Sequence, residues 1–154
     1  MIEAHVDASD EVDISDLEAK LRTLPLDEIV AFDEIFTRLH RRSYTWPLWG
    51  AAYVINGGRS DDGFADFRGW LIAQGRAVYE KALDDPDSLA DTTASVASCE
   101  EIQYAAASAY EAASGGIEMP IPSSRHPELG PGWDFNDKAE MQRRYPRLFA
   151  QSGT

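Results

Sequence analysis

Residues 45–75 have the sequence TWPLWGAAYVINGGRSDDGFADFRGWLIAQG, which holds three of the four tryptophans of this 154-residue chain. Apolar residues recur at helical spacing on both sides of the pair Gly57-Gly58, so the pattern predicts two helices joined by a tight polar turn. The glycine pair ends the earlier helix. Ser60 is the predicted N-cap of the later helix, whose first turn holds Asp61 and Asp62, where carboxylates are stabilised by the helix dipole.

Within this stretch, WPLWGAAYVINGG followed by SDDGFADFRGWLIAQG resembles the signature of a bacterial family of unknown function that is common in actinobacteria. The similarity runs from about Leu21 to Leu89 and continues weakly into the tail WDFNDKAEMQRRYPRLF. The resemblance implies a small soluble helical domain and lends no reaction. Such proteins usually open with an aromatic helix of the F-W-x-L-I type, whereas this chain begins MIEAHVDASDEVD.

Helical periodicity recurs along the rest of the chain. A serine followed three residues later by glutamate, the pattern of a capping box, occurs at Ser15 and Ser98. The predicted helices are therefore a short one from Ser15, one from Pro25 to about Arg42, one opened by Pro47, one from Ser60 that continues through Gly75 to Leu83, one over 100–113, and one over 136–145 that Pro146 ends.

The fold class that follows is all-α, because no convincing run alternates polar with β-branched residues. We expect a single compact bundle of five to seven helices, with a Pro-rich irregular strap over 119–133. Residues 1–13 are acidic and aperiodic, which predicts a mobile acidic leader before a single helical domain over 14–150.

The net charge of −13 limits the classes of partner. Residues 1–34 and 84–134 each carry −9, whereas residues 35–83 carry +3 and residues 135–154 carry +2. Phosphate backbones and anionic membranes repel such a surface, so neither nucleic acid nor membrane is an expected partner. No signal-peptide-like or membrane-length apolar stretch occurs and the single Cys99 cannot form an internal disulfide, so we expect a cytoplasmic protein.

Known catalytic and cofactor motifs are missing from the sequence. No phosphate loop, zinc quartet, nucleophile elbow or dinucleotide fingerprint occurs, and His5, His40 and His126 are too scattered for a metal motif. We therefore expect neither a metal site nor a cofactor. Glu100 and Glu101 would raise the pKa of Cys99, so an unreactive thiol is expected.

The polar turn and its aromatic flanks form the candidate site. We predict a cytoplasmic binding domain rather than an enzyme, whose partner is a basic protein or a small polar ligand, at a groove around residues 46–70. Trp49 and Trp70 share the periodicity of core residues, which leaves Trp46 and Tyr53 as the better pocket residues. The candidate ligand-binding residues are Trp46, Trp49, Tyr53, Asn56, Arg59, Ser60, Asp61, Asp62 and Arg68.

An enzymatic alternative stays open. Adjacent carboxylates in a turn can act as a base or bind a divalent cation, so Asp61 or Asp62 could serve a small hydrolase or a metal-dependent enzyme, with Arg68 orienting the substrate. Adjacent helical residues point about 100° apart, however, and aspartates are common in a first turn for capping alone. The sequence names neither a reaction nor an oligomeric state.

Overall fold

The structure is a computed structural model that describes residues 5–6, 12–58, 60–92, 97–120 and 127–152. These residues form two short strands, eight α-helices and two 3-10 helices. Their bounds are β1 His5–Val6, β2 Val12–Asp13, α1 Ser15–Arg22, α2 Leu26–Arg42, α3 Trp46–Asn56, α4 Asp61–Ala73, α5 Arg76–Asp84, η1 Pro86–Asp91, η2 Glu101–Tyr104, α6 Ala105–Ser114, α7 Lys138–Arg144 and α8 Pro146–Gln151.

The predicted all-α fold class is confirmed. Seven α-helices of the described residues are seven or more residues long, within the predicted range. The two-residue strands β1 and β2 form one antiparallel pair in the N-terminal leader, of which residues 1–4 and 7–11 lie outside the described residues. None of the helices in the described part of the chain is both long and apolar enough to cross a membrane.

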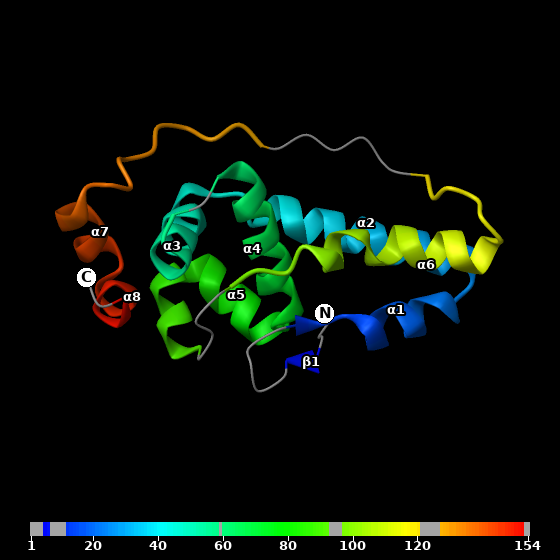
Figure 1. The fold of residues 1–154 in the computed structure, drawn as a ribbon. Helices are drawn as coiled ribbons and strands as arrows, with labels where there is room; N and C mark the ends of the chain where they lie inside the picture. The colour runs from blue at the N-terminus through cyan, green and yellow to red at the C-terminus, as the bar shows by residue number, and fades with distance from the viewer. Residues whose placement is uncertain (1–4, 7–11, 59, 93–96, 121–126, 153–154) are drawn as a thin grey trace.

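The helices are arranged around α4. Helices α1, α2 and α6 pack together at one end, and α7 and α8 lie beside α3 and η1 at the other (Figure 1). Most of α4 is buried, including Phe67, Trp70 and Leu71, each at most 1% exposed. A helix that is apolar around most of its circumference belongs inside the core, which is why α4 stands at the centre.

Several predicted helix boundaries are confirmed. Helix α2 ends at Arg42 as expected, and Pro47 lies in the first turn of α3. Gly57 ends α3 in the left-handed conformation, with φ of 76°, which glycine adopts at little cost. Ser60 caps α4, because its Oγ accepts a hydrogen bond from the Gly63 amide at 3.3 Å.

Other boundaries differ from the prediction. The helix expected to run through Gly75 breaks there, because Gly75 has φ of 100° and separates α4 from α5. The helix predicted over 136–145 does end before Pro146, as α7, but Pro146 then occupies the first position of a further helix, α8, where proline needs no amide donor. Ser15 and Ser98 are not the N-caps of their predicted helices: Ile14 is the N-cap of α1 and Glu100 that of η2, and neither makes a side-chain cap hydrogen bond. Ile14 precedes α1 and is anchored in the core, and the first turn before α6 is the 3-10 helix η2.

Candidate functional site

The turn between α3 and α4 displays its polar side chains to solvent. Ser60, Asp61 and Asp62 are exposed, and both aspartates lie in the first turn of α4. Arg59, also a candidate binding residue, lies outside the described residues. No group of three or more His, Cys, Asp or Glu side chains is placed to hold a metal ion in the part of the chain that the structure describes.

Arg68 is buried beneath this turn and does not line a groove. Its side chain is 0% exposed, and its Nη1 donates to the carbonyl oxygen of His40 at 2.6 Å, in the last turn of α2. The guanidinium lies over the rings of both Tyr44 and Phe64, at 4.8 and 4.7 Å from their centres. Burial lowers the pKa of Arg68 to about 10. Its Nη2 is buried without a hydrogen-bond partner among the described residues. Through the bond to His40, Arg68 joins α4 to α2 inside the protein.

The tryptophans of the candidate site belong to a continuous series of ring contacts, which we call the aromatic ladder. Trp49 stacks on Phe64 with ring centres 4.7 Å apart, and Trp46 stacks on Trp49 at 5.2 Å. Nε1 of Trp46 donates to the carbonyl oxygen of Gly130 at 2.6 Å, so this side chain binds the Pro-rich segment to α3. The ladder consists of Trp133, Phe135, Trp46, Trp49, Phe64, Phe67 and Trp70.

A pocket of about 490 Å³ opens beside the C-terminal half of α3. One wall is the end of α3, and the opposite wall comes from the C-terminal region. The lining residues are Tyr53, Val54, Ile55, Asn56, Gly57, Phe135, Asn136, Lys138, Met141, Phe149 and Ser152. Of the candidate binding residues, the structure therefore brings Tyr53 and Asn56 to the pocket, and Trp46, Trp49, Ser60, Asp61, Asp62 and Arg68 do not line it.

The two candidate residues in the pocket wall are held by long-range hydrogen bonds. The hydroxyl of Tyr53 donates to Oδ1 of Asn136 at 2.5 Å. The amide group of Asn56 bonds both backbone groups of Ala97, accepting from its N–H at 2.9 Å and donating to its carbonyl oxygen at 3.1 Å. These bonds fix the end of α3, and with it the shape of the pocket wall.

Cys99 lies buried elsewhere, between α4 and η2. Its backbone N–H donates to the carbonyl oxygen of Asp66 at 3.0 Å. Burial raises the pKa of the Cys99 thiol to about 11, and the nearby Glu101 and Asp66 act in the same direction. The thiol is therefore protonated at neutral pH.

The comparisons with known proteins place the chain in a family. The model of the family described as "Protein of unknown function (DUF4240)" matches residues 1–112, well over half of the chain. The chain belongs to the DUF4240 family. The description names no activity, and no curated protein and no solved structure matches the chain.

The far wall of the pocket lies beyond the DUF4240 match. We call residues 127–152 the C-terminal arm and the helices from α1 to α6 the body. Sequence reasoning from the α3–α4 turn missed the arm residues of the pocket, because about 80 positions separate Tyr53 from Phe135 and Asn136. The available signal was the aromatic tail WDFNDKAEMQRRYPRLF, to which the family resemblance extended weakly.

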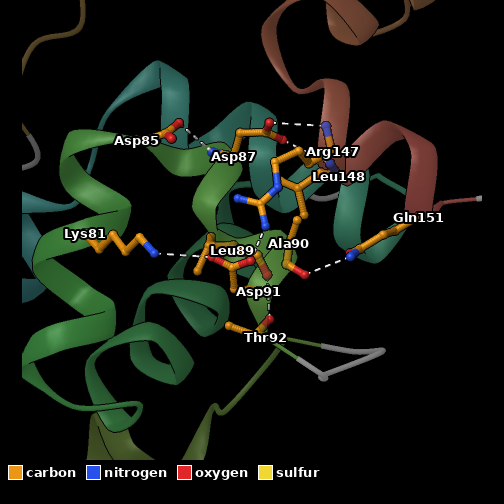
Figure 2. A network of polar contacts seen from close by, with 10 residues as sticks. All are labelled: Lys81, Asp85, Asp87, Leu89, Ala90, Asp91, Thr92, Arg147, Leu148 and Gln151. Atoms are coloured by element: carbon orange, nitrogen blue, oxygen red, sulfur yellow. Dashed lines mark hydrogen bonds and ion pairs between the residues drawn. The ribbon is translucent and has the colours of Figure 1, made fainter.

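Asp87 of η1, within the DUF4240 match, anchors the arm at the start of α8. Asp87 is 7% exposed, and its carboxylate accepts hydrogen bonds from the backbone N–H groups of Arg147 and Leu148, at 3.1 and 2.9 Å. Figure 2 shows this contact beside two others, the Arg147 side chain on Asp91 and the Gln151 amide on the carbonyl oxygen of Ala90. A carboxylate from the body thus satisfies the first free amides of an arm helix.

A second anchor lies at the junction of α7 and α8. Tyr145 is 2% exposed, and its hydroxyl donates to the carbonyl oxygen of Pro47 at 2.6 Å. The ring occupies space that only a glycine in α3 leaves free: a Cβ added at Gly50 would lie 2.3 Å from the Tyr145 hydroxyl oxygen. Gly50 therefore acts as the socket for this side chain.

Proposed function

We propose that this protein is a binding domain that holds a small, largely apolar ligand with one acidic group in the pocket between α3 and the C-terminal arm. The observation that carries the proposal is the pocket itself, because about 490 Å³ falls within the range of about 300 to 1,000 Å³ that is usual for ligand sites. The pocket also joins apolar and aromatic walls to a small number of polar groups, which is the composition of a ligand site.

The lining indicates the class of ligand. Ile55, Phe135, Met141 and Phe149 give apolar surface for a ring or a short chain. Lys138 is the one charged residue among the described residues that line the pocket. Its ammonium group makes no hydrogen bond or ion pair with the described part of the chain. An acidic group on the ligand would therefore meet an available cation in a protein that is otherwise strongly acidic.

Titration with a matched pair of probes tests the proposal. We expect 3-phenylpropionate to shift the amide NMR signals of the pocket residues in the full chain, and 3-phenylpropanamide, which keeps the shape without the charge, to bind more weakly. Lys138→Gln should weaken binding of the acid and leave that of the amide unchanged. Lys20→Gln, an exposed change on α1, is the control. Absence of shifts, or shifts scattered away from the pocket, would contradict the proposal.

The earlier alternatives stay predictions. An enzyme using Asp61 or Asp62 with Arg68 gains no support from the geometry, because Arg68 is fully buried. Binding to a basic protein through the acidic segments predicts an association rate that falls steeply with salt, and a salt-insensitive rate would exclude it. The cytoplasmic location also remains a prediction.

A further inference from the structure

The pocket has one wall in the body and one in the C-terminal arm. We propose that the arm docks and undocks as a unit, so that ligand binding in the pocket and docking of the arm stabilise each other. This inference rests on the proposed function and concerns the regulation of the same site.

The pocket is lined by residues of both the body and the arm. Among the described residues, the body contributes the consecutive residues 53–57, at the end of α3. The arm contributes the remaining lining residues, which are Phe135, Asn136, Lys138, Met141, Phe149 and Ser152. Without the docked arm, one turn of a helix remains, and a two-walled pocket for a small molecule does not. A ligand that contacts both walls therefore binds the docked state better than the undocked state.

The arm is held on the body by few fully buried side chains and by several exposed polar contacts. Only Met141, Tyr145 and Leu148 of the arm are buried apolar or aromatic residues in the described structure. Trp133, Phe135 and Phe149 of the arm are half-buried and pack against the core. The remaining contacts are hydrogen bonds and ion pairs, several of them exposed, such as the Arg147–Asp91 and Tyr53–Asn136 contacts. Water can replace such contacts, so this interface has the character of a segment that opens at low free-energy cost.

The arm begins with a segment that has no regular secondary structure. Residues 127–132 contain no helix or strand and are mostly exposed. Most buried residues of the core around α4 belong to the body, and Met141, Tyr145 and Leu148 are the buried arm residues that join it in the described structure. Undocking therefore breaks the contacts of the arm without disrupting a helix of the body.

Gly50→Ala offers a way to undock the arm from the body side. The added methyl group would lie 2.3 Å from the Tyr145 hydroxyl oxygen, so the tyrosine must leave its socket. Alanine suits the interior of α3 better than glycine does, so the body should not be weakened. Gly50 does not line the pocket, so a change in ligand affinity reports on the arm.

The experiment compares the wild-type chain with Gly50→Ala, using 3-phenylpropionate as the probe. We expect about tenfold weaker binding by the variant, which corresponds to an arm docked in about a tenth of the molecules. Amide hydrogen exchange over 138–151 should be faster in Gly50→Ala without the probe. In the wild type, saturating probe should slow exchange of these amides by the factor that relates its affinities for the docked and undocked states.

Two further variants keep the test specific. Gly50→Ala/Tyr145→Phe should recover part of the affinity, because phenylalanine lacks the clashing hydroxyl group. Arg143→Ala removes an exposed arm side chain that pairs with Glu140, and should bind the probe like the wild type. Equal affinities of Gly50→Ala and wild type, with unchanged exchange over 138–151, would overturn the coupling alone. Absence of probe binding to the wild type would overturn the proposed function, and the coupling with it.

Discussion

Two glycines within helices let another segment approach closely, and the two contacts differ in kind. At Gly69 of α4, an added Cβ would lie 2.8 Å from the backbone carbonyl oxygen of Cys99 and 2.8 Å from a methyl group of Ile102. At Gly50 of α3, it would meet the end of the Tyr145 side chain. The first contact lies inside the DUF4240-matched span, and the second joins that span to the arm.

The difference separates a permanent contact from a reversible one. Around Gly69, backbone approaches backbone among fully buried residues, so neither side can move without disturbing the core. Around Gly50, one ring and one hydroxyl group occupy the socket, and the arm can withdraw them together. The body and the arm should therefore respond separately to substitutions and to pH.

The largest effect is expected for Gly69→Ala. Overpacking costs about 1 to 3 kcal/mol, and the better helix propensity of alanine offsets up to about 1 kcal/mol. Because the clash is with a backbone atom, we expect the upper end of this cost, a net loss of about 2 kcal/mol in the free energy of unfolding of the whole domain, measured by denaturant titration. Gly50→Ala has the same gain in propensity and is the matched control. An equal loss in both variants would remove the distinction between the two contacts.

Asp87→Asn should loosen the arm and leave the body intact. The amide keeps one oxygen for the two backbone donors of α8, so one buried N–H loses its acceptor, at about 1.5 kcal/mol. Faster hydrogen exchange over 146–151, with unchanged exchange in α4, is the expected result. Asp91→Asn, which alters the exposed ion pair between η1 and Arg147 of the arm, should have a much smaller effect. Faster exchange in α4 would mean that the arm and the body open together.

Ser60→Ala should weaken the body alone, because the Ser60 side chain caps α4 within the body. Loss of the cap leaves the Gly63 amide without its acceptor and costs about 0.5 to 2 kcal/mol. Asp62→Asn should cost less than about 1 kcal/mol, since the amide forfeits only the interaction with the helix dipole. Thermal unfolding compares the two variants. Loss of probe binding in Asp62→Asn at an unchanged melting temperature would restore this turn as a functional site.

The smallest effect is expected on acidification. Hydrogen bonds from Arg143 and Arg144 lower the pKa of Glu140 from 4.5 to about 2. Because the folded-state pKa is depressed, the stabilisation of α7 is fully present above pH 4.5 and is lost as the pH falls towards 2. Exchange-sensitive NMR between pH 5 and 2.5 should show α7 loosening over this range. Glu140→Gln should abolish the pH dependence in α7, and its persistence would assign the transition to another group.

Local features of the fold could be predicted from sequence, and the pocket could not. The stop at Gly57 and the cap at Ser60 depend on residues one turn away, so their chemistry is visible in the chain itself. The turn of direction at Gly75 was missed because a single glycine inside an apolar period is compatible with either a helix or a break.

Most residues of the candidate site do not line the pocket, because their positions depend on contacts between distant segments. Arg68 lies about two helical turns from the exposed aspartates in sequence, yet the packing of α2 against α4 encloses it. Lys138 and Phe149 reach α3 only because Tyr145 and α8 dock where they do. Such placement depends on tertiary contacts, which helical periodicity does not reveal.

The aromatic ladder gives the molecule an internal optical reporter. Its rings follow one another from Trp133 in the arm to Trp70 in the core, with neighbouring ring centres between 4.7 and 6.1 Å apart. All four tryptophans of the chain belong to it, and the contact between Phe135 and Trp46 joins the arm to the body. Rings held this close in a chiral arrangement couple their electronic transitions. Withdrawal of the arm would therefore alter the near-ultraviolet circular dichroism and tryptophan emission of the native protein without any added label.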